Sequence, residues 1–411
     1  MRDLVSIETA HGALTFDAAA GNIPKLRLRW AGRWIEPLHA APWRDEPEVQ
    51  ADTRLPLVDR RLAGDFFCAP FAGAVDPNVP PHGWTANSAW RVTEQERGLL
   101  RAVLGAAAEL ADLPLTLPSP RSRGEGMLEA EAVPHLPSPR ERGEGPGRGM
   151  RGDAHVTTVL GATIAKILAL AEDAPLLYQE HVIESGNGIL PVAHHPMVHL
   201  TGTGRFFTSR KRAVLTPDRP LEPGRGRLAY PARSTDLTRV AAADGGTVDL
   251  TRWPIGTRNE DFAVLVEAVP EGIGWSAVIR EAEDDIVFFL KDPAVLPITM
   301  LWFSNGGRDH APWNGRHVGV VGVEDGCAPG LAGEAAAGQP NPIAAEGVAS
   351  GLALAEGRRH VVRHVTGAVP RPAGWTGIAD ISTAGDRLTI SDGAGQRLEL
   401  PWRRDFLKGR D

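Results

Sequence analysis

Three segments of the chain combine histidine with aromatic, amide, arginine and carboxylate side chains. They span residues 80–91, 191–199 and 302–317, and the third leads through a run of valines and glycines to Glu324. Aromatic rings can stack on the apolar C–H face of a sugar, while planar polar groups hydrogen-bond to its paired hydroxyls. These residue types therefore predict a carbohydrate site.

Two of these residue types can transfer protons. Glutamate and histidine have ordinary pKa values of about 4.3 and 6.5, so one can take and the other can give a proton near neutral pH. A glycosidase would need two carboxylates around one bond, which Glu324 and Asp261 could supply, but the histidines would then have no role. No Gly-x-Ser-x-Gly motif occurs, so a serine nucleophile is not indicated.

The spacing of the histidines does not favour metal binding. His195 and His199 are four residues apart. On a strand they would share one face at a separation of roughly 13 Å, which is too far for one ion. Only a helix would bring them together, and Pro196 argues against a helix. We expect no metal and no other cofactor.

The composition limits the class of protein. The chain has 411 residues, a net charge of −7, 46 glycines and 34 prolines, which favours turns and strands over a helical bundle. The mild acidity gives no reason to expect a nucleic acid partner. No uninterrupted apolar stretch reaches the roughly 18 residues of a membrane span, so no membrane partner is expected. Cys68 and Cys327 are too few for a disulfide framework, and the acidic N-terminus is unlike a signal peptide, so we expect a cytoplasmic protein.

Short alternating segments predict an all-β fold. Strands are expected at residues 26–30, 262–268 and 275–279, in the sheet segment 169–182, and in a hairpin formed by 387–391 and 397–400. One helix is expected at 94–110, from its composition. Because strands do not alternate with helices, a large antiparallel β-sandwich is the expected fold class.

Residues 111–153 differ from the rest of the chain. The decapeptide at 117–126 recurs almost unchanged at 136–145, and Pro, Gly, Arg and Glu dominate. Such a segment cannot bury enough apolar surface to order itself. We therefore expect a disordered surface loop inserted into a single β-sandwich domain that spans 1–411. Residues 147–152 match the glycine spacing of a dinucleotide-binding turn, but neither the strand nor the helix that this motif needs is evident beside them.

The order of the polar segments resembles the aldose 1-epimerase (galactose mutarotase-like) superfamily. The resemblance rests on His82-Gly83 before an aromatic residue, then His195-Pro196, then a strand ending in Gly322-Val323-Glu324, with Gly-Asp-Phe-Phe-Cys-Ala-Pro at 64–70 ahead of them. It covers roughly residues 65–327 without the insert. The resemblance implies a β-supersandwich with a shallow cleft for a pyranose, whose α and β anomers interconvert by acid–base ring opening. The implied partner is a small-molecule sugar.

The resemblance also implies roles for individual residues. Glu324 would be the general base and His195 the general acid. His82 would bind a ring hydroxyl or the ring oxygen, and Asp261 would hold sugar hydroxyls, with Glu260 beside it as the alternative. Further candidates for the cleft wall are Trp84, Asn87, Arg91, Trp313, Asn314 and Arg316.

Two departures from the superfamily pattern bear on the substrate. Met197 and Val198 follow Pro196 where the superfamily commonly has an aromatic residue, and Asp-Gly-Cys-Ala-Pro follows Glu324 where it often has Thr or Gln. They leave open a different sugar, or a protein that binds a sugar without turning it over. A third alternative is an epimerase for a phosphorylated or sulfonated sugar, with Arg91 or Arg316 binding the anion.

Overall fold

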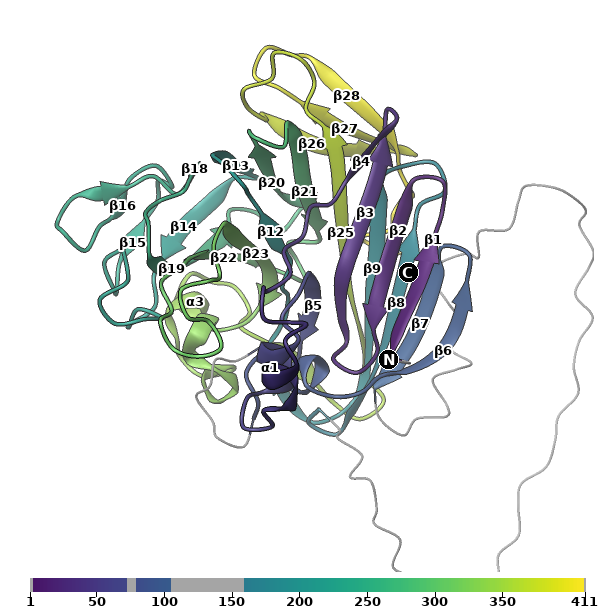
Figure 1. Ribbon diagram of the computed structural model, residues 1–411, viewed down its shortest axis with the longest axis horizontal. Helices are drawn as coiled ribbons and strands as arrows, with labels where there is room; N and C mark the ends of the chain where they lie inside the picture. Colours follow the sequence, from purple (N-terminus) through teal and green to yellow (C-terminus); the bar gives the residue numbers. More distant parts are fainter. Residues whose placement is uncertain (1–2, 72–78, 105–158, 410–411) are drawn as a thin grey trace, which may run out of the picture.

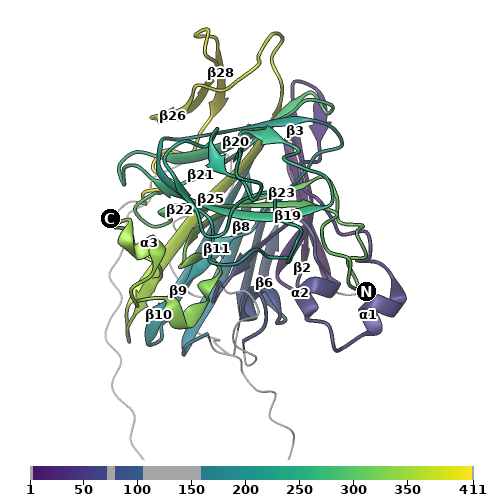
Figure 2. The ribbon, with the colours of Figure 1, turned by 90° about the vertical axis from the view of Figure 1, so that its left-hand side faces the viewer.

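Two large sheets, of twelve and nine strands, form the body of the protein in the computed structural model, which describes residues 3–71, 79–104 and 159–409. Figures 1 and 2 show the sheets from two directions. Neighbouring strands in both sheets run antiparallel. The all-β antiparallel class predicted from the sequence is confirmed.

The twelve-stranded sheet contains both the N-terminal strands and the strands that carry the third polar segment. In spatial order its strands are β1 (Leu4–Glu8), β2 (Gly12–Asp17), β3 (Asn22–Trp30), β5 (Asp65–Cys68), β11 (Val192–His194), β23 (Val320–Cys327), β22 (Ile298–Asn305), β19 (Asn259–Glu267), β14 (Lys211–Leu215) and β15 (Arg233–Ser234). Two short strands lie off this path: β4 (Arg33–Ile35) pairs with β3, and β12 (Met197–His199) pairs with β23.

The nine-stranded sheet packs against the first. In spatial order its strands are β18 (Arg252–Trp253), β13 (Gly204–Thr208), β20 (Gly274–Arg280), β21 (Asp285–Lys291), β25 (Arg359–Pro370), β9 (Leu176–Ser185), β8 (Ala162–Leu170), β7 (Leu99–Leu104) and β6 (Arg91–Glu96). Residues of both sheets, such as Val323 of β23 and Val287 of β21, belong to one apolar core.

A three-stranded sheet near the C-terminus adds a third layer. It consists of β26 (Asp380–Ala384), β27 (Arg387–Ser391) and β28 (Arg397–Pro401), drawn in yellow at the top of Figure 1. Leu388 and Leu400 share an apolar cluster with Leu176 and Phe288 of the nine-stranded sheet, so the small sheet covers that sheet's outer face.

The remaining elements are short. Two further strand pairs are β10 (Gly188–Leu190) with β24 (Leu352–Leu354), and β16 (Val240–Ala241) with β17 (Thr247–Val248). The helices are α1 (Pro47–Ala51), α2 (Leu57–Arg60) and α3 (Pro342–Ala345), with 3-10 turns at Trp84–Ala86, Gly330–Ala332 and Glu334–Ala336. No helix in the described residues is long and apolar enough to cross a membrane.

Side-chain alternation on β23 shows how the sheet positions the candidate site. Val321 and Val323 point into the core between the two large sheets, and Val320 belongs to a separate apolar cluster on the other face. Because successive residues of a strand point to opposite faces, Gly322 and Glu324 share the face of Val320. The strand period therefore directs the Glu324 carboxylate away from the inter-sheet core.

Most of the expected strands are present, and the prediction of a helix at 94–110 is wrong over the described residues 94–104. The segments at 26–30, 275–279, 387–391 and 397–400 lie within strands, 262–268 lies in β19 except for its last residue, and 169–182 runs from the end of β8 into β9. The expected helix at 94–110 is instead the end of β6, a turn at Gly98 and β7. Helical composition is a weak preference there, since β7 buries its leucines against β8. Residues 105–110, the repeat insert at 111–153 and its glycine motif lie outside the described residues.

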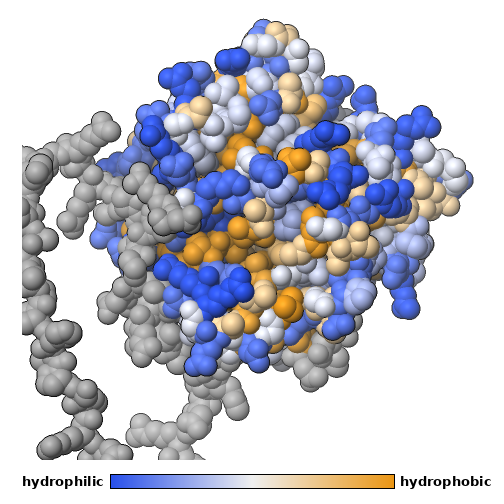
Figure 3. Space-filling view, turned by 180° about the vertical axis from the view of Figure 1, so that it is seen from behind, coloured by the Kyte–Doolittle hydropathy of each residue, from blue (hydrophilic) through white to orange (hydrophobic). Residues whose placement is uncertain are grey.

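The surface offers few large apolar side chains. Among the described residues, the exposed ones are Leu4, Trp34, Val269 and Val318. Figure 3 shows the face seen from behind, where hydrophilic residues surround a short apolar strip.

Candidate active site

A pocket lies on the face of the twelve-stranded sheet that points away from the inter-sheet core. Phe262, Trp302 and Gly322 form one row across β19, β22 and β23 in the strand register, and Glu324 lies two register positions further along, opposite Met300. The cavity has a volume of about 50 Å³, which is below the usual range of small-molecule sites. The pocket is lined by Asp59, Leu62, Phe71, His82, His195, Leu221, Phe262, Trp302, Arg308, Trp313, Glu324 and Leu331.

An acid–base pair lies in this pocket. His195 Nε2 is 3.1 Å from Glu324 Oε1, and both side chains are almost fully buried. Burial raises the pKa of Glu324 well above its ordinary value and lowers the pKa of His195 to about 4. The other polar atoms of the pair, Glu324 Oε2 and His195 Nδ1, make no hydrogen bond within the described residues. The pair therefore holds one proton near neutral pH and keeps an acceptor oxygen available.

Gly322 makes room for the Glu324 carboxylate. The two residues are on the same face of β23. A Cβ at Gly322 would lie 2.9 Å from Glu324 Oε1 and 3.1 Å from Trp302 Cβ. Contacts this short would force the carboxylate to move, so a glycine is required two residues before Glu324.

His82 completes a set of rings around His195. Its ring packs edge-on against His195 at 4.9 Å between centroids, while Phe66 stacks on His195 at 4.4 Å. His82 has a φ of 63°, in the left-handed region, and precedes Gly83. Asn87 holds this turn, because its Nδ2 donates to the carbonyls of Pro81 and Gly83. Burial lowers the pKa of His82 well below its ordinary value, so His82 is a neutral hydrogen-bonding group.

Arg308 lies over the aromatic wall of the pocket. Its guanidinium carbon is 4.2 Å from the Trp313 ring and 5.4 Å from the Trp302 ring. Two carboxylates neutralise it: Nε is 3.2 Å from Glu260 Oε1 and 3.4 Å from Glu222 Oε1. Glu260 also accepts hydrogen bonds from Trp302 Nε1 and Ser304 Oγ, and burial raises its pKa to about 7.

Four of the ten residues predicted from the sequence line this pocket, namely Glu324, His195, His82 and Trp313. Asn87 lies behind the pocket and acts on His82 through the backbone. Trp84 is half-buried and packs against the inter-sheet core. Arg91 is exposed at the start of β6, and Asn314 is exposed in the loop after Trp313. Arg316 pairs with Glu46 and donates to the Pro312 carbonyl.

Asp261 is not brought to the pocket. Its carboxylate accepts hydrogen bonds from the backbone N–H groups of Arg227 and Leu228 and from the Tyr230 hydroxyl. The physical reason is strand alternation on β19: Phe262 faces the pocket, so Asp261 faces the opposite way and Glu260 faces the pocket side. The acidic residue that the sequence analysis gave as the alternative is the one beside Arg308.

Sequence reasoning missed Trp302 and Arg308 as individual residues, although both lie in the third polar segment. The alternation of strand residues could have indicated Trp302, because it shares one face of β22 with Met300 and Ser304. Arg308 follows the end of β22 in a loop. Its reach over two tryptophans depends on the loop conformation, which has no sequence period.

One group of buried residues between the sheets has metal-ligand chemistry. Ligand atoms of Asp65, His194 and His364 lie within 4.8 Å of one another. However, the His194 and His364 rings stack at an interplanar angle of 16°, with centroids 4.4 Å apart. A ligating lone pair lies in the plane of its ring, so the lone pairs of two stacked rings do not converge on one point. This group does not fit a metal site.

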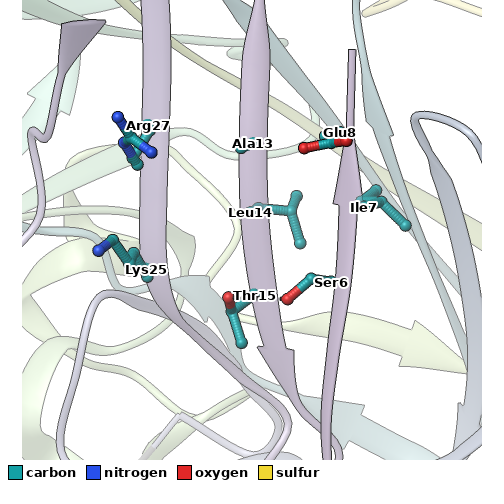
Figure 4. Close-up of a pocket in the computed structure, with 8 residues that line it drawn as sticks. All are labelled: Ser6, Ile7, Glu8, Ala13, Leu14, Thr15, Lys25 and Arg27. Carbon is teal, nitrogen blue, oxygen red and sulfur yellow. Dashed lines mark hydrogen bonds between the residues drawn. The ribbon is translucent and has the colours of Figure 1, made fainter.

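A second depression, on β1, β2 and β3, does not have the residues of an acid–base site. Figure 4 shows its lining of Ser6, Ile7, Glu8, Ala13, Leu14, Thr15, Lys25 and Arg27. Ser6 and Thr15 hydrogen-bond to each other, and Lys25 and Arg27 both lie near Glu36. Without an aromatic ring or a histidine, this groove is a polar sheet surface.

Several solved structures share the fold of this chain at low sequence identity. A protein from Escherichia coli that is itself a proposed aldose 1-epimerase covers 89% of this chain and 98% of its own, with 13% identity and a TM-score of 0.53. An aldose epimerase homologue from C. elegans covers 90% and 99%, with 12% identity and a TM-score of 0.52. A galactose mutarotase related enzyme from Lactobacillus acidophilus covers 90% and 98%, with 12% identity and a TM-score of 0.50.

The comparisons define the fold and no more. No protein-family model matches the chain, and a comparison with curated proteins gave no match. At 12–13% identity, the structural similarity shows the galactose mutarotase-like fold, as the sequence resemblance predicted. One fold supports many activities, so the activity of this chain depends on the residues of its own pocket.

Proposed function

We propose that this protein is a mutarotase that interconverts the α and β anomers of an uncharged pyranose. The observation that carries the proposal is the contact between His195 Nε2 and Glu324 Oε1, at 3.1 Å, inside a pocket walled by Trp302 and Trp313. Such a pair supplies one base and one acid, which is what ring opening of a hemiacetal requires.

The mechanism uses the single proton that the pair holds. Glu324 holds that proton at rest, and its transfer to His195 gives the reactive form. In this form the Glu324 carboxylate takes the proton of the anomeric hydroxyl while His195 donates its proton to the ring oxygen. The bond between the anomeric carbon and the ring oxygen breaks, and the open-chain aldehyde forms. Rotation about the first carbon–carbon bond and the reverse transfers then give the other anomer. Because both oxygens are bonded to one carbon, an acid and a base in mutual contact can reach both.

The remaining pocket groups suit a neutral sugar. Trp302 and Trp313 offer ring faces or edges for the C–H groups, and His82 and Arg308 are available as hydrogen-bonding groups. Arg308 is the arginine that lines the pocket, and it already lies within 3.4 Å of two carboxylates, Glu222 and Glu260. Asp59 adds a further acidic group. A phosphate or sulfonate would meet this negative charge, so we favour an uncharged substrate over a phosphorylated one.

The test is anomeric exchange measured by NMR saturation transfer on a panel of free aldoses and their 6-phosphates. We expect the protein to accelerate exchange of at least one neutral aldose. Glu324→Gln and His195→Gln should each reduce the rate by about 10²–10⁴-fold, the usual contribution of acid–base catalysis. The matched controls are Glu356→Gln and His11→Gln, both outside the pocket, and these should keep the wild-type rate.

The alternatives give different results. Ligand-induced shifts without faster exchange would replace this proposal by a carbohydrate-binding protein of the same fold. Faster exchange of a 6-phosphate alone would contradict the electrostatic argument for a neutral substrate. Wild-type exchange that survives both pocket substitutions would refute the assignment of Glu324 and His195.

A further inference from the structure

The buried carboxylate of Asp65 lies behind His195, on the side away from the pocket. Asp65 opens β5, and the next residue, Phe66, faces the pocket side, where it stacks on the His195 ring. By strand alternation the Asp65 side chain points toward the inter-sheet core, where it is 1% exposed. Strand β5 therefore contacts His195 twice: Phe66 packs on its ring on the pocket side, and Asp65 lies on the buried side.

Asp65 contacts the backbone of the proposed acid directly. The His195 N–H donates to Asp65 Oδ1 at 3.1 Å and to the Phe66 carbonyl at 2.9 Å. The second carboxylate oxygen of Asp65 accepts from Gln179 Nε2 at 2.6 Å. Both oxygens thus have a donor, and the carboxylate is held in one orientation toward His195.

Among the described residues, Asp65 is an anion with no lysine or arginine at ion-pair distance, although Lys166 interacts with it electrostatically from further away. Burial alone would raise its pKa, but His194, His364 and the Gln179 hydrogen bond outweigh burial and lower it. His194 Nδ1 is 3.9 Å from Asp65 Oδ2, and burial lowers the pKa of His194 to about 4, so that ring is neutral near pH 7. Within the described residues, no lysine or arginine lies within ion-pair distance of Asp65. Its negative charge is therefore available to act on neighbouring groups.

The charged and titratable groups around His195 come from several elements. On the pocket side they are Glu324 of β23, His82 of the turn before Trp84, and Arg308 and His317 of the loop after β22. On the buried side they are Asp65 and His194. Arg308 disfavours a proton on His195, and Asp65 favours one. Glu324 is the partner that exchanges the proton.

We infer that Asp65 is a positioning residue for the proposed acid: its hydrogen bond fixes the His195 backbone, and its charge stabilises the protonated imidazole. This inference rests on the proposed function, because a protonated His195 is the form that donates to the ring oxygen. Asp65 does not line the pocket and touches no substrate. It acts by moving the shared proton from Glu324 toward His195.

The first experiment reads the His195 ring without any substrate. The ring ¹⁵N shifts are followed as the pH is lowered from 7 in the wild-type protein and in Asp65→Asn, with His195→Gln used to assign the signals. Asn keeps an acceptor oxygen but removes the charge. We expect the midpoint of the His195 titration to move to lower pH in the variant. The matched control, Asp285→Asn, removes another buried carboxylate, one paired with Arg280, and should leave the midpoint unchanged. Identical midpoints in wild type and Asp65→Asn would overturn the inference.

The second experiment uses turnover. Each unit of pKa lost by His195 lowers the protonated fraction about tenfold, so Asp65→Asn should lower kcat about tenfold or more and leave KM unchanged. A tenfold change in KM without any change in kcat would contradict a positioning role. If wild type turns over no sugar, the proposed function fails, and the ring shifts still decide the role of Asp65.

A further variant applies if Asp65→Asn does not fold. Gln179→Met removes the donor that orients Asp65 and leaves its charge. We expect the backbone N–H signal of His195 to shift and its hydrogen exchange to accelerate, because Asp65 is free to turn away. An unchanged His195 amide in this variant would refute the positioning argument.

Discussion

Replacing Glu324 by Gln should change how folding stability depends on pH. In the folded protein, burial raises the pKa of Glu324 well above its ordinary value of 4.5 and lowers the pKa of His195 from 6.5 to about 4. In the unfolded chain both groups return to their ordinary values. Stability rises with pH where the unfolded state binds more protons and falls where the folded state binds more.

The sign follows for each group. Glu324 binds its proton more tightly when folded, so its contribution is fully present below pH 4.5 and is lost as pH rises toward its folded pKa. His195 binds its proton less tightly when folded, so its contribution grows as pH rises from about 4 to 6.5. Each effect amounts to about 1.4 kcal/mol per pH unit. They cancel between about pH 4.5 and 6.5, and above that range the loss from Glu324 remains.

The Gln variant isolates the Glu324 effect, because Gln fills the same space without titrating. The free energy of unfolding of Glu324→Gln minus that of the wild type should therefore rise by about 1.4 kcal/mol per pH unit. The difference should grow as pH rises above 4.5 and level off above the folded pKa of Glu324. Urea unfolding at three pH values measures it, and His195→Gln should show the opposite trend below pH 6.5. A difference that stays constant with pH would mean that Glu324 is ionised when folded, and would refute the reasoning.

Three other substitutions test separate parts of the structure. Gly322→Ala places a methyl group 2.9 Å from Glu324 Oε1, so we expect a stability loss of about 1–3 kcal/mol and a larger relative loss of turnover, measured by urea unfolding and anomeric exchange. Trp313→Leu removes a pocket wall that contacts ground state and transition state alike, so KM should rise several-fold with little change in kcat, and a change in kcat alone would contradict this role. Leu388→Ala opens a cavity under the C-terminal sheet and should cost about 2–5 kcal/mol in urea unfolding, while turnover per folded molecule stays at the wild-type level.

The elements that could be predicted from the sequence are those with a clear local signal. The hairpin of β27 and β28 has two alternating strands around a glycine-containing turn, and its register matches that expectation. Residues 94–104 lack such a signal, because Glu, Gln, Arg and Leu are good helix formers. Their strand conformation comes from pairing with β8, which is distant in the sequence. A local preference could not reveal that partner.

The candidate site was predictable where a residue belongs to one of the short sequence motifs, although β23 continues past Glu324 to Cys327 instead of ending there. His82, His195 and Glu324 come from three distant segments, and the structure brings all three to one pocket. Residues that were predicted to line the pocket only because they are close in sequence to these motifs do not all lie there. Arg316 follows Trp313 closely, yet its side chain turns toward Glu46, while Arg308, eight residues earlier, covers the Trp313 ring. Loop side chains have no period that could indicate their direction.

Adjacent carboxylates on β23 show how much depends on the register of one strand. Glu324 faces the pocket, where burial without a cation raises its pKa. Asp325 faces the inter-sheet core, where Lys291 at 2.8 Å and His364 at 3.0 Å outweigh burial and keep its pKa well below the ordinary value. The same strand thus holds one carboxyl group that binds its proton more tightly than usual and one that stays ionised. Composition cannot distinguish these neighbours, and a shift of β23 by one residue would exchange their roles. The pairing of Gly322 with Trp302 fixes that register, so the chemistry of Glu324 depends on the packing of β22 as much as on its own side chain.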